Sequence, residues 1–267
     1  MITEQEFQRV AAYVKGKAGI NLNEKKVLVQ GRLDSYMQRK GYSSYDAFMD
    51  RVEKFPTGPE AEDLMNALTT NHTYFWREYE QFLFLKQEVF PELKSRTEST
   101  KDWHIWCAAS STGEEPYTLA MLCKDFLGLE QGEWDTKILA TDIDTKVLEK
   151  ATRGVYARNS VDQLPQQYVR RFFKQISQEE YRVKDELKRE VLLRQLNLMN
   201  PLPFKKPIHV VFIRNVMIYF DEPTKERLLR NIYEKMAPGG YLFIGSTESM
   251  SQNNTQFQYV KPSIYRK

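Results

Sequence analysis

The chain has 267 residues, of which 41% are hydrophobic and 28% charged, and its formal net charge at pH 7 is +3. This is the composition of a globular protein, and the length accommodates one large domain or a large domain with a smaller one. So small a net charge gives no overall case for a protein that binds nucleic acid or a membrane surface, and any basic partner surface has to be local.

Cysteine and histidine are too few and too scattered for a disulfide framework or a metal centre. Cys107 and Cys123 adjoin apolar segments, which favours reduced, buried thiols. No HxxxH or CxxC spacing occurs, so no metal is expected. The first residues lack the basic and apolar regions of a signal peptide, and no apolar stretch reaches the ~18 residues of a membrane span. We therefore expect a cytoplasmic protein that does not insert directly into a membrane.

The first part of the chain carries helical patterns only. Thr3 and Glu6 form a capping-box pattern ahead of a first helix that is expected to end near Gly16, and Asn23 is expected to cap the second. A break rich in proline and glycine follows the third. The helices are expected at about 3–16, 24–40, 44–52, 60–68 and 77–95. We predict an all-α N-terminal domain with its linker over 1–90.

After a polar stretch at 95–100, short apolar runs alternate with helical patterns, which is typical of a mostly parallel sheet. Strands are expected at 103–109, 137–141, 191–196, 209–213 and 241–245, with a closing pair at 257–260 and 264–265. Helices are expected at 114–126, 145–152 and 223–236. The less regular stretch at about 156–190 is interpreted as an insertion with a helix at 165–173 and a strand at 180–183. The sequence therefore predicts an α/β domain over 91–267.

The segment 106–117 has the order strand, small-residue turn and helix start that begins a nucleotide-binding α/β fold. Its Ala, Ser and Gly let the backbone approach a ligand, and the helix N–H groups favour a negative group. The turn is not GxGxxG, and Glu114 and Glu115 have a plain alternative role at the helix dipole. Beyond the next strand, Asp142 can accept hydrogen bonds from ribose hydroxyls, whereas Asp144 is expected to cap a helix.

Two further segments have the composition of a binding site. Residues 68–78 combine Thr, Asn and Arg with four aromatic side chains, which suits a pocket wall, although Asn71 or Thr73 alternatively caps the helix that follows. Arg214 and Asn215 follow a buried strand, and ligands of open α/β sheets bind at that edge. A buried arginine there needs a partner, which favours a site over solvated surface.

These segments resemble the CheR-type chemoreceptor glutamate methyltransferases along essentially the whole chain. The motifs that carry the resemblance are TTNHTYFWRE (69–78), AASSTGEEPYTLA (108–120), ATDIDTKVLEKA (140–151), RNVMIYF (214–220) and GSTES (245–249). The resemblance implies a Rossmann-like class I methyltransferase domain with a small β insertion, preceded by an all-α domain. It also implies methyl transfer from S-adenosylmethionine to glutamates of bacterial chemoreceptors, with S-adenosylhomocysteine as product.

The resemblance further implies roles for single residues. Matching positions predict cofactor contacts from Asn71, Thr73, Arg77, Glu115, Asp142, Asn197, Leu198, Arg214 and Asn215. Glu115 is preferred to Glu114. Tyr219 matches the tyrosine near the transferred methyl, and we place Tyr219 and Arg77 at the catalytic centre as positioning groups. A substrate glutamate with a pKa near ~4.3 is already ionised at neutral pH, so the reaction needs no general base.

Basic residues recur every seven positions on the second expected helix, with two more beside them; they are Lys25, Arg32 and Arg39, then Lys26 and Lys40. This stripe is either an ordinary solvated face or, as the resemblance implies, the surface that docks the acidic methylation helices of the cytoplasmic domain of a methyl-accepting chemoreceptor.

One departure from the family concerns the insertion. Some members carry a glycine-containing segment there that binds a C-terminal pentapeptide tether of the receptor, and the corresponding residues 172–181 contain no glycine. We therefore expect that the protein does not require such a tether. Two alternatives to the receptor methyltransferase remain at this point: an enzyme of the same fold that methylates another protein or a small molecule, and a non-catalytic cofactor-sensing module.

Overall fold

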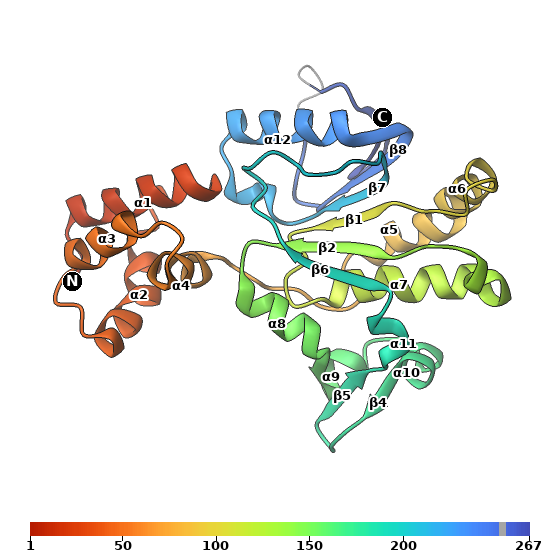
Figure 1. Ribbon diagram of the computed structural model, residues 1–267, viewed down its shortest axis with the longest axis horizontal. Coiled ribbons are helices and arrows are strands. Elements are labelled where there is room, and N and C mark those ends of the chain that lie inside the picture. Colours follow the sequence, from red (N-terminus) through yellow and green to blue (C-terminus); the bar gives the residue numbers. More distant parts are fainter. Residues whose placement is uncertain (251–254) are drawn as a thin grey trace.

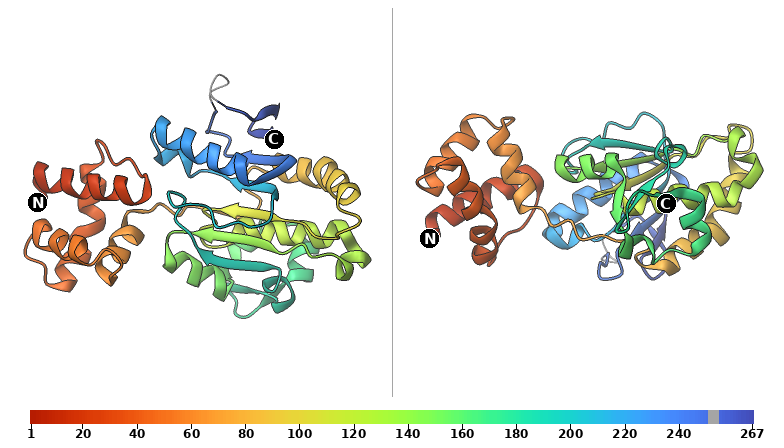
Figure 2. Two further views of the ribbon diagram at one scale, coloured as in Figure 1. Left: turned by 45° about the horizontal axis from the view of Figure 1, so that its top comes forward. Right: turned by 90° about the horizontal axis from the view of Figure 1, so that it is seen from below.

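A computed structural model describes residues 1–250 and 255–267, and it shows a helical unit followed by an α/β unit (Figure 1). The helical unit lies to one side of the sheet, and an extended linker connects the two (Figures 1 and 2). Its helices are α1 Glu4–Ala18, α2 Lys26–Lys40, α3 Tyr45–Lys54 and α4 Pro59–Leu68. The predicted all-α start of the chain is confirmed.

The first helix begins where the sequence predicts. The Thr3 hydroxyl accepts the Glu6 N–H at 3.2 Å, and the Glu6 carboxylate accepts the Thr3 N–H at 2.8 Å. Its other oxygen accepts the Tyr45 N–H at 3.1 Å, so the capping box also ties α1 to α3. The predicted end near Gly16 is wrong, because the helix continues through that residue to Ala18 and is capped by Gly19, which has φ 72°. Gly19 supplies the left-handed conformation that closes a helix.

The predicted cap of the second helix is also wrong. Helix α2 starts at Lys26, and its N-cap residue Lys25 makes no side-chain capping bond. The Asn23 N–H instead donates to the Asn21 side chain at 3.0 Å, which closes a tight turn before the helix. The end of α2 at Gly41, with φ 76°, agrees with the expected helix end.

The α/β unit contains a seven-stranded sheet in the order β6-β2-β1-β7-β8-β10-β9. The first five of these are parallel to one another, and β10 runs antiparallel to both of its neighbours, β8 and β9. Their bounds are β1 Ile105–Ala108, β2 Ile138–Asp142, β6 Val191–Gln195, β7 Ile208–Ile213, β8 Met236–Ile244, β9 Gln258–Lys261 and β10 Ile264–Arg266. The Rossmann-like, mostly parallel sheet predicted from the alternating pattern is confirmed.

Helices cover both faces of this sheet. On one face, α7 and the helical segment after the linker share a core with sheet residues, and Phe82 stacks on Phe212 with ring centroids 5.7 Å apart. On the other face, Leu228 and Ile232 of α12 pack with Val211 and Leu242. The helices are α5 Tyr79–Phe84, α6 Phe90–Arg96, α7 Glu114–Leu127, α8 Thr145–Arg153 and α12 Glu222–Lys235, with a π-helical turn at Leu85–Val89 and 3-10 turns at Gly128–Glu133 and Met217–Tyr219. The domain boundary at residue 90 stays a prediction.

The insertion forms a separate three-stranded antiparallel sheet in the order β3-β5-β4. Its elements are β3 Val155–Ala157, α9 Arg158–Val161, α10 Gln166–Phe172, β4 Phe173–Gln175, β5 Glu180–Val183 and α11 Asp185–Lys188. Tyr156 anchors it: the hydroxyl donates to the Thr112 carbonyl at 2.7 Å, and the ring meets Phe75 edge-on at 4.9 Å. A Cβ on Gly113, where φ is +98°, would lie 2.8 Å from that hydroxyl. In the described part of the chain, no helix is long and apolar enough to cross a bilayer.

Two glycines of α1 give opposite predictions for stability. Gly16 lies inside the helix with nothing within 4 Å of a Cβ, so Gly16→Ala should raise the free energy of unfolding by about 1 kcal/mol. Gly19→Ala should lower it by about 2 kcal/mol or more, because a left-handed residue gains a Cβ 2.6 Å from the Met199 sulfur. Urea unfolding of both variants measures the difference. A helix that ended at Gly16 would give the reverse order.

Candidate functional site

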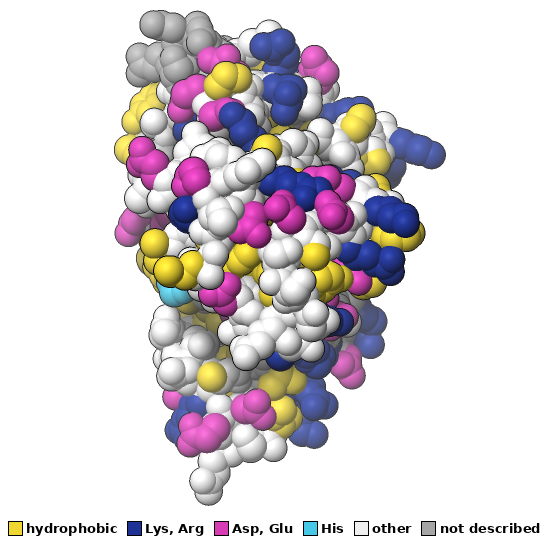
Figure 3. Space-filling view, turned by 90° about the vertical axis from the view of Figure 1, so that its left-hand side faces the viewer, with side chains coloured by type: hydrophobic (Ala, Val, Ile, Leu, Met, Phe, Trp, Pro, Cys, Tyr) yellow, Lys and Arg dark blue, Asp and Glu magenta, His cyan; other side chains and the backbone are white. Residues whose placement is uncertain are grey.

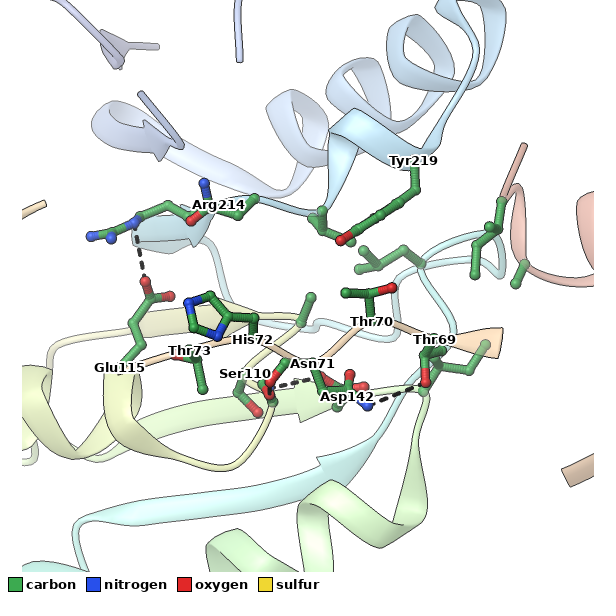
Figure 4. A pocket seen from close by; sticks show the side chains of 18 of the residues that line it. Thr69, Thr70, Asn71, His72, Thr73, Ser110, Glu115, Asp142, Arg214 and Tyr219 are labelled. Atoms are coloured by element: carbon green, nitrogen blue, oxygen red, sulfur yellow. Dashed lines mark hydrogen bonds and ion pairs between the residues drawn. The ribbon is translucent and has the colours of Figure 1, made fainter. Parts of the chain in front are cut away.

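A cleft of about 940 Å³, part of it open to solvent, lies at the carboxyl ends of the parallel strands. Its walls come from the end of α1, the linker, the turn after β1, the end of β2 and the segments after β6 and β7. Tyr219 and Arg214 approach it from one side, and Asn71, Ser110 and Asp142 from the other (Figure 4). Its mixed polar and apolar lining is that of a small-molecule site.

All the residues predicted for the cofactor and the catalytic centre line this one cleft; they are Asn71, Thr73, Arg77, Glu115, Asp142, Asn197, Leu198, Arg214, Asn215 and Tyr219. Glu114 does not line it. The side chain of Glu114 is buried elsewhere and accepts the Thr112 hydroxyl at 2.6 Å. The contacts of these residues with a ligand stay predictions, but their convergence on a shared cavity is a property of the fold.

The turn after β1 is compact and bonded on both sides. Ala109 and Ser111 adopt left-handed backbone conformations, with φ 55° and 49°. The Ser111 N–H donates to Asp142 Oδ2 at 2.8 Å, and the Ser111 hydroxyl donates to the Asn71 carbonyl at 3.0 Å. The turn thus joins the second strand to the linker.

The two aspartates after β2 have different partners. Asp144 Oδ1 accepts the Lys146 and Val147 N–H groups, which confirms its predicted role as the cap of α8. Its Oδ2 accepts Asn71 Nδ2 at 2.7 Å and the Thr69 hydroxyl at 3.0 Å. Asp144 therefore holds the linker as well as the helix. The alternative in which Asn71 or Thr73 caps the next helix is wrong, because α5 begins only at Tyr79 and has no side-chain cap.

Asp142 is buried at the cleft floor. Its carboxylate accepts the Asp144 N–H at 2.9 Å and the Ser111 N–H at 2.8 Å. Burial raises its pKa to about 6, although these backbone donors oppose the rise. A carboxylate so held keeps further lone pairs for a ligand, because each oxygen accepts more than one hydrogen bond.

Arg214 is the buried cation of the site, with 1% of its side chain exposed. Its Nε lies 3.1 Å from Glu115 Oε2 and 3.8 Å from Glu78 Oε2, and its guanidinium lies over the Phe82 ring at 5.2 Å. Its Nη2 donates to the Arg77 carbonyl of the linker. Within the described ranges, Nη1 has no hydrogen-bond partner, and Nε makes no well-directed bond despite its short distance to Glu115. The guanidinium therefore keeps donors for an anionic group.

Glu115 is enclosed by the same network. The Cys107 thiol donates to its Oε1 at 3.1 Å. Burial raises the pKa of Glu115, and the charge of Arg214 opposes that rise. The side chains of Arg214, Glu115 and Cys107 thus form one buried cluster at the cleft, in which the charges of Arg214 and Glu115 oppose each other.

Tyr219 and Arg77 lie at the cleft with few fixed side-chain contacts. The Tyr219 carbonyl accepts the Asn21 N–H at 2.7 Å, so the loop after α1 holds its backbone, and Lys25 Nζ lies 5.7 Å from its ring centroid. Arg77 Nη1 donates to the His72 carbonyl at 2.9 Å. Both side chains line the cleft and are only partly buried.

Sequence reasoning missed two carboxylates that do not line the cleft but bond to residues that do. Glu78 has a left-handed backbone, with φ 60°, and accepts the Ser246 N–H at 3.1 Å. Glu248 accepts four backbone N–H groups from the segments after β7 and β8. Both lie inside motifs that the resemblance uses, and that position is the only signal that pointed to them.

The predicted docking residues do not line the cleft and do not form one free basic stripe. Lys26 pairs with Glu4 at 3.1 Å, and Arg32 donates to the Thr69 carbonyl at 2.8 Å, holding the start of the linker. Arg39 and Lys40 are exposed. Figure 3, which looks onto the side of the helical unit, shows basic and acidic side chains interspersed. Docking by these residues stays a prediction.

The donor set of the cleft fits a nucleoside that carries an amino-acid group. Arg214 Nη1 and the buried Ser110 hydroxyl, both without a partner among the described residues, suit a carboxylate. Asp142 suits a ribose, and Ile143 and Leu198 offer apolar surface for a base.

Known proteins match both units of the chain. The family described as CheR methyltransferase, all-alpha domain, matches residues 5–69, and the one described as CheR methyltransferase, SAM binding domain, matches residues 71–266. A chemotaxis protein methyltransferase of Borreliella burgdorferi is 36% identical over 100% of this chain and 95% of its own length. The corresponding protein of Escherichia coli is 34% identical over 99% of this chain and 91% of its own length.

The ion pair between Arg214 and Glu115 gives a stability prediction. Arg214→Met should lower the free energy of unfolding at pH 7 by about 3–5 kcal/mol, because it leaves Glu115 buried without its cation. The double variant Arg214→Met/Glu115→Gln should recover part of that loss, since no unpaired charge remains at Glu115. Chemical denaturation of the two single variants and the double variant measures the coupling. Strictly additive losses would contradict the ion-pair interpretation.

Proposed function

The chain belongs to the CheR methyltransferase family, and from that premise we propose that it methylates glutamate side chains of bacterial chemoreceptors, forming glutamyl methyl esters. It carries a domain that binds S-adenosylmethionine, and full-length relatives are named chemotaxis protein methyltransferases. The observation that supports the proposal most is the convergence of all ten predicted residues on one cleft.

We assign the cofactor contacts by chemistry. Arg214 would take the carboxylate, because it is a buried cation with a donor that lacks a partner in the described structure. Asp142 would accept the ribose hydroxyls, and Leu198 would face the base. When bound, S-adenosylmethionine supplies a methyl group on a positively charged sulfur, which is the electrophile.

The residues of the chain then have to position the acceptor rather than activate it. A glutamate carboxylate with a pKa near ~4.3 is ionised at neutral pH and needs no proton removed. It has to approach in line, within about 3–3.5 Å, and with water excluded. Tyr219 and Arg77 both line the cleft, which supports their proposed roles in orienting the acceptor.

Docking of the receptor is assigned to α2. Arg39 and Lys40 are its exposed basic residues, and they suit steering of an acidic partner helix. Arg32 and Lys26 contribute less to such a surface, because their side chains already bind the linker and Glu4. Lys25 is the N-cap residue of this helix, and its Nζ lies over the Tyr219 ring, 5.7 Å from the centroid.

Methyl transfer is tested with radiolabelled S-adenosylmethionine and the cytoplasmic fragment of a chemoreceptor. We expect label on the receptor that base releases as methanol, because the product is an ester. Arg39→Glu should reduce this transfer several-fold and leave the affinity for S-adenosylhomocysteine unchanged, with the exposed Glu234→Gln as a control. Label that resists base, or transfer only to a small molecule, would favour another methyltransferase, and no transfer to any acceptor would favour a non-catalytic module.

The raised pKa of Asp142 gives a pH dependence of cofactor binding. Below about pH 6 the carboxyl of the free protein is protonated, whereas ribose hydroxyls favour the ionised form. The affinity for S-adenosylhomocysteine should therefore fall as the pH drops through about 6, by up to tenfold per pH unit, and should level off above it. Calorimetry from pH 5 to about 8 measures this.

Asp142→Asn should bind more weakly at pH 8 and lose the pH dependence. Glu114→Gln, which changes a buried carboxylate outside the cleft, should keep it. The same pH dependence in Asp142→Asn as in the unmodified protein would refute the assignment.

A further inference from the structure

We propose that Glu248 is a positioning residue for methyl transfer, whose carboxylate fixes the segment that carries Asn215 and Tyr219 into the cleft. The inference rests on the proposed function and adds a residue that does not itself line the cleft. Four backbone N–H groups donate to its carboxylate.

Both oxygens of the Glu248 carboxylate accept two backbone N–H groups. Oε1 accepts Met217 at 2.7 Å and Ile218 at 3.2 Å. Oε2 accepts Asn215 at 2.8 Å and Gly245 at 2.6 Å. Three of the four donors belong to the segment after β7, and the fourth follows β8. One side chain thus joins the carboxyl ends of two neighbouring strands.

The backbone and the carboxylate depend on each other. Asn215 has a left-handed conformation, with φ 56°, which turns the chain so that successive N–H groups converge on one point. Convergent backbone donors form a concavity that favours an anion. Among the described residues, the contacts of the Glu248 carboxylate are with backbone N–H groups, so backbone dipoles stabilise its charge.

Gly245 packs closely against both the Glu248 carboxylate and the Asn215 backbone. A Cβ on Gly245 would lie 2.8 Å from Glu248 Oε2 and 2.9 Å from the Asn215 nitrogen. Glycine is therefore the residue that lets β8 end against the carboxylate. Asn215 is held a second time, because its side-chain amide lies 3.4 Å from Glu78 Oε1.

This anchor is adjacent to the proposed catalytic centre. Tyr219 follows Ile218 directly, its N–H donates to the Val216 carbonyl at 3.2 Å, and its carbonyl accepts the Asn21 N–H. Glu248 therefore holds the turn on one side of Tyr219, and the helical unit holds it on the other. A displacement of about 1 Å at a positioning group is enough to slow a reaction substantially.

Only glutamate meets all four donors. Glutamine has one acceptor oxygen, and its amide would face two N–H groups with donors of its own. Aspartate keeps the charge but is one methylene too short to reach the same positions. Both substitutions should therefore release part of the turn, whereas the cofactor wall around Arg214 stays bonded to Glu115 and to the linker.

The test compares turnover with cofactor affinity in Glu248→Gln. We expect kcat for methyl transfer to the receptor fragment to fall about tenfold or more, because two bonds to a charged acceptor are lost. The dissociation constant of S-adenosylhomocysteine, measured by calorimetry, should rise by less than about threefold, because Asn215 is the one predicted cofactor contact in the released turn and its side chain stays bonded to Glu78. Glu248→Asp should likewise lower kcat much more than it changes the affinity for S-adenosylhomocysteine. It replaces Glu248→Gln in the test if the glutamine variant does not fold. Glu234→Gln, the same charge change on the exposed face of α12, should match the unmodified protein.

A double-variant cycle shows whether Glu248 acts through Tyr219. The kcat of Tyr219→Phe/Glu248→Gln should be only slightly lower than the kcat of Tyr219→Phe alone. Once the Tyr219 hydroxyl is absent, displacing the ring has little further effect on methyl transfer. Additive losses in kcat, an unchanged kcat in Glu248→Gln, or an affinity loss as large as the kcat loss would each overturn the inference. An unmodified protein that transfers no methyl to the receptor would instead contradict the proposed function, and the inference would fall with it.

Discussion

The cleft depends on one buried guanidinium. Arg214 directly follows the central strand β7, and removing its charge from water is costly unless carboxylates compensate it. Those carboxylates come from two other parts of the chain, Glu115 at the start of α7 and Glu78 at the end of the linker. The linker carbonyl of Arg77 takes one of the remaining donors. The linker is therefore part of the site's electrostatics, and it cannot move away without leaving buried charge unpaired.

The helical unit also contacts the segments that form this cleft. The loop after α1 bonds to the backbone of Tyr219, and Ile20 forms an isolated bridge with Phe220. Asn66 and Asp63 of α4 contact Thr145 and Lys146 at the start of α8. Residues from both units thus define where a ligand can lie, although the two units have different architectures and separate positions in the sequence.

Sequence reasoning reached the long elements because their signals are local. Apolar runs and turn residues predicted the five parallel strands, and Thr3 with Glu6 predicted the start of α1. Strands of three residues, such as β3 and β4, are too short to show a period, and they form only because β5 lies between them. Gly16 and Asn23 carried plausible end and cap signals, but Gly19 and the turn at Asn21 provided the actual geometry.

The ordered motifs predicted which residues line the cleft, but they did not predict the hydrogen bonds that these residues and their neighbours make. No spacing rule shows that Asn71 donates to Asp144, that Arg32 donates to the linker, or that Glu248 accepts four backbone N–H groups. Such bonds join residues that are tens of positions apart, and only the tertiary fold sets them. The same holds for the insertion, where Tyr156 bonds to the Thr112 carbonyl beside Gly113. Because the base of that small sheet packs against the turn after β1, length changes can be absorbed at its exposed tip, residues 176–179, and not at its root.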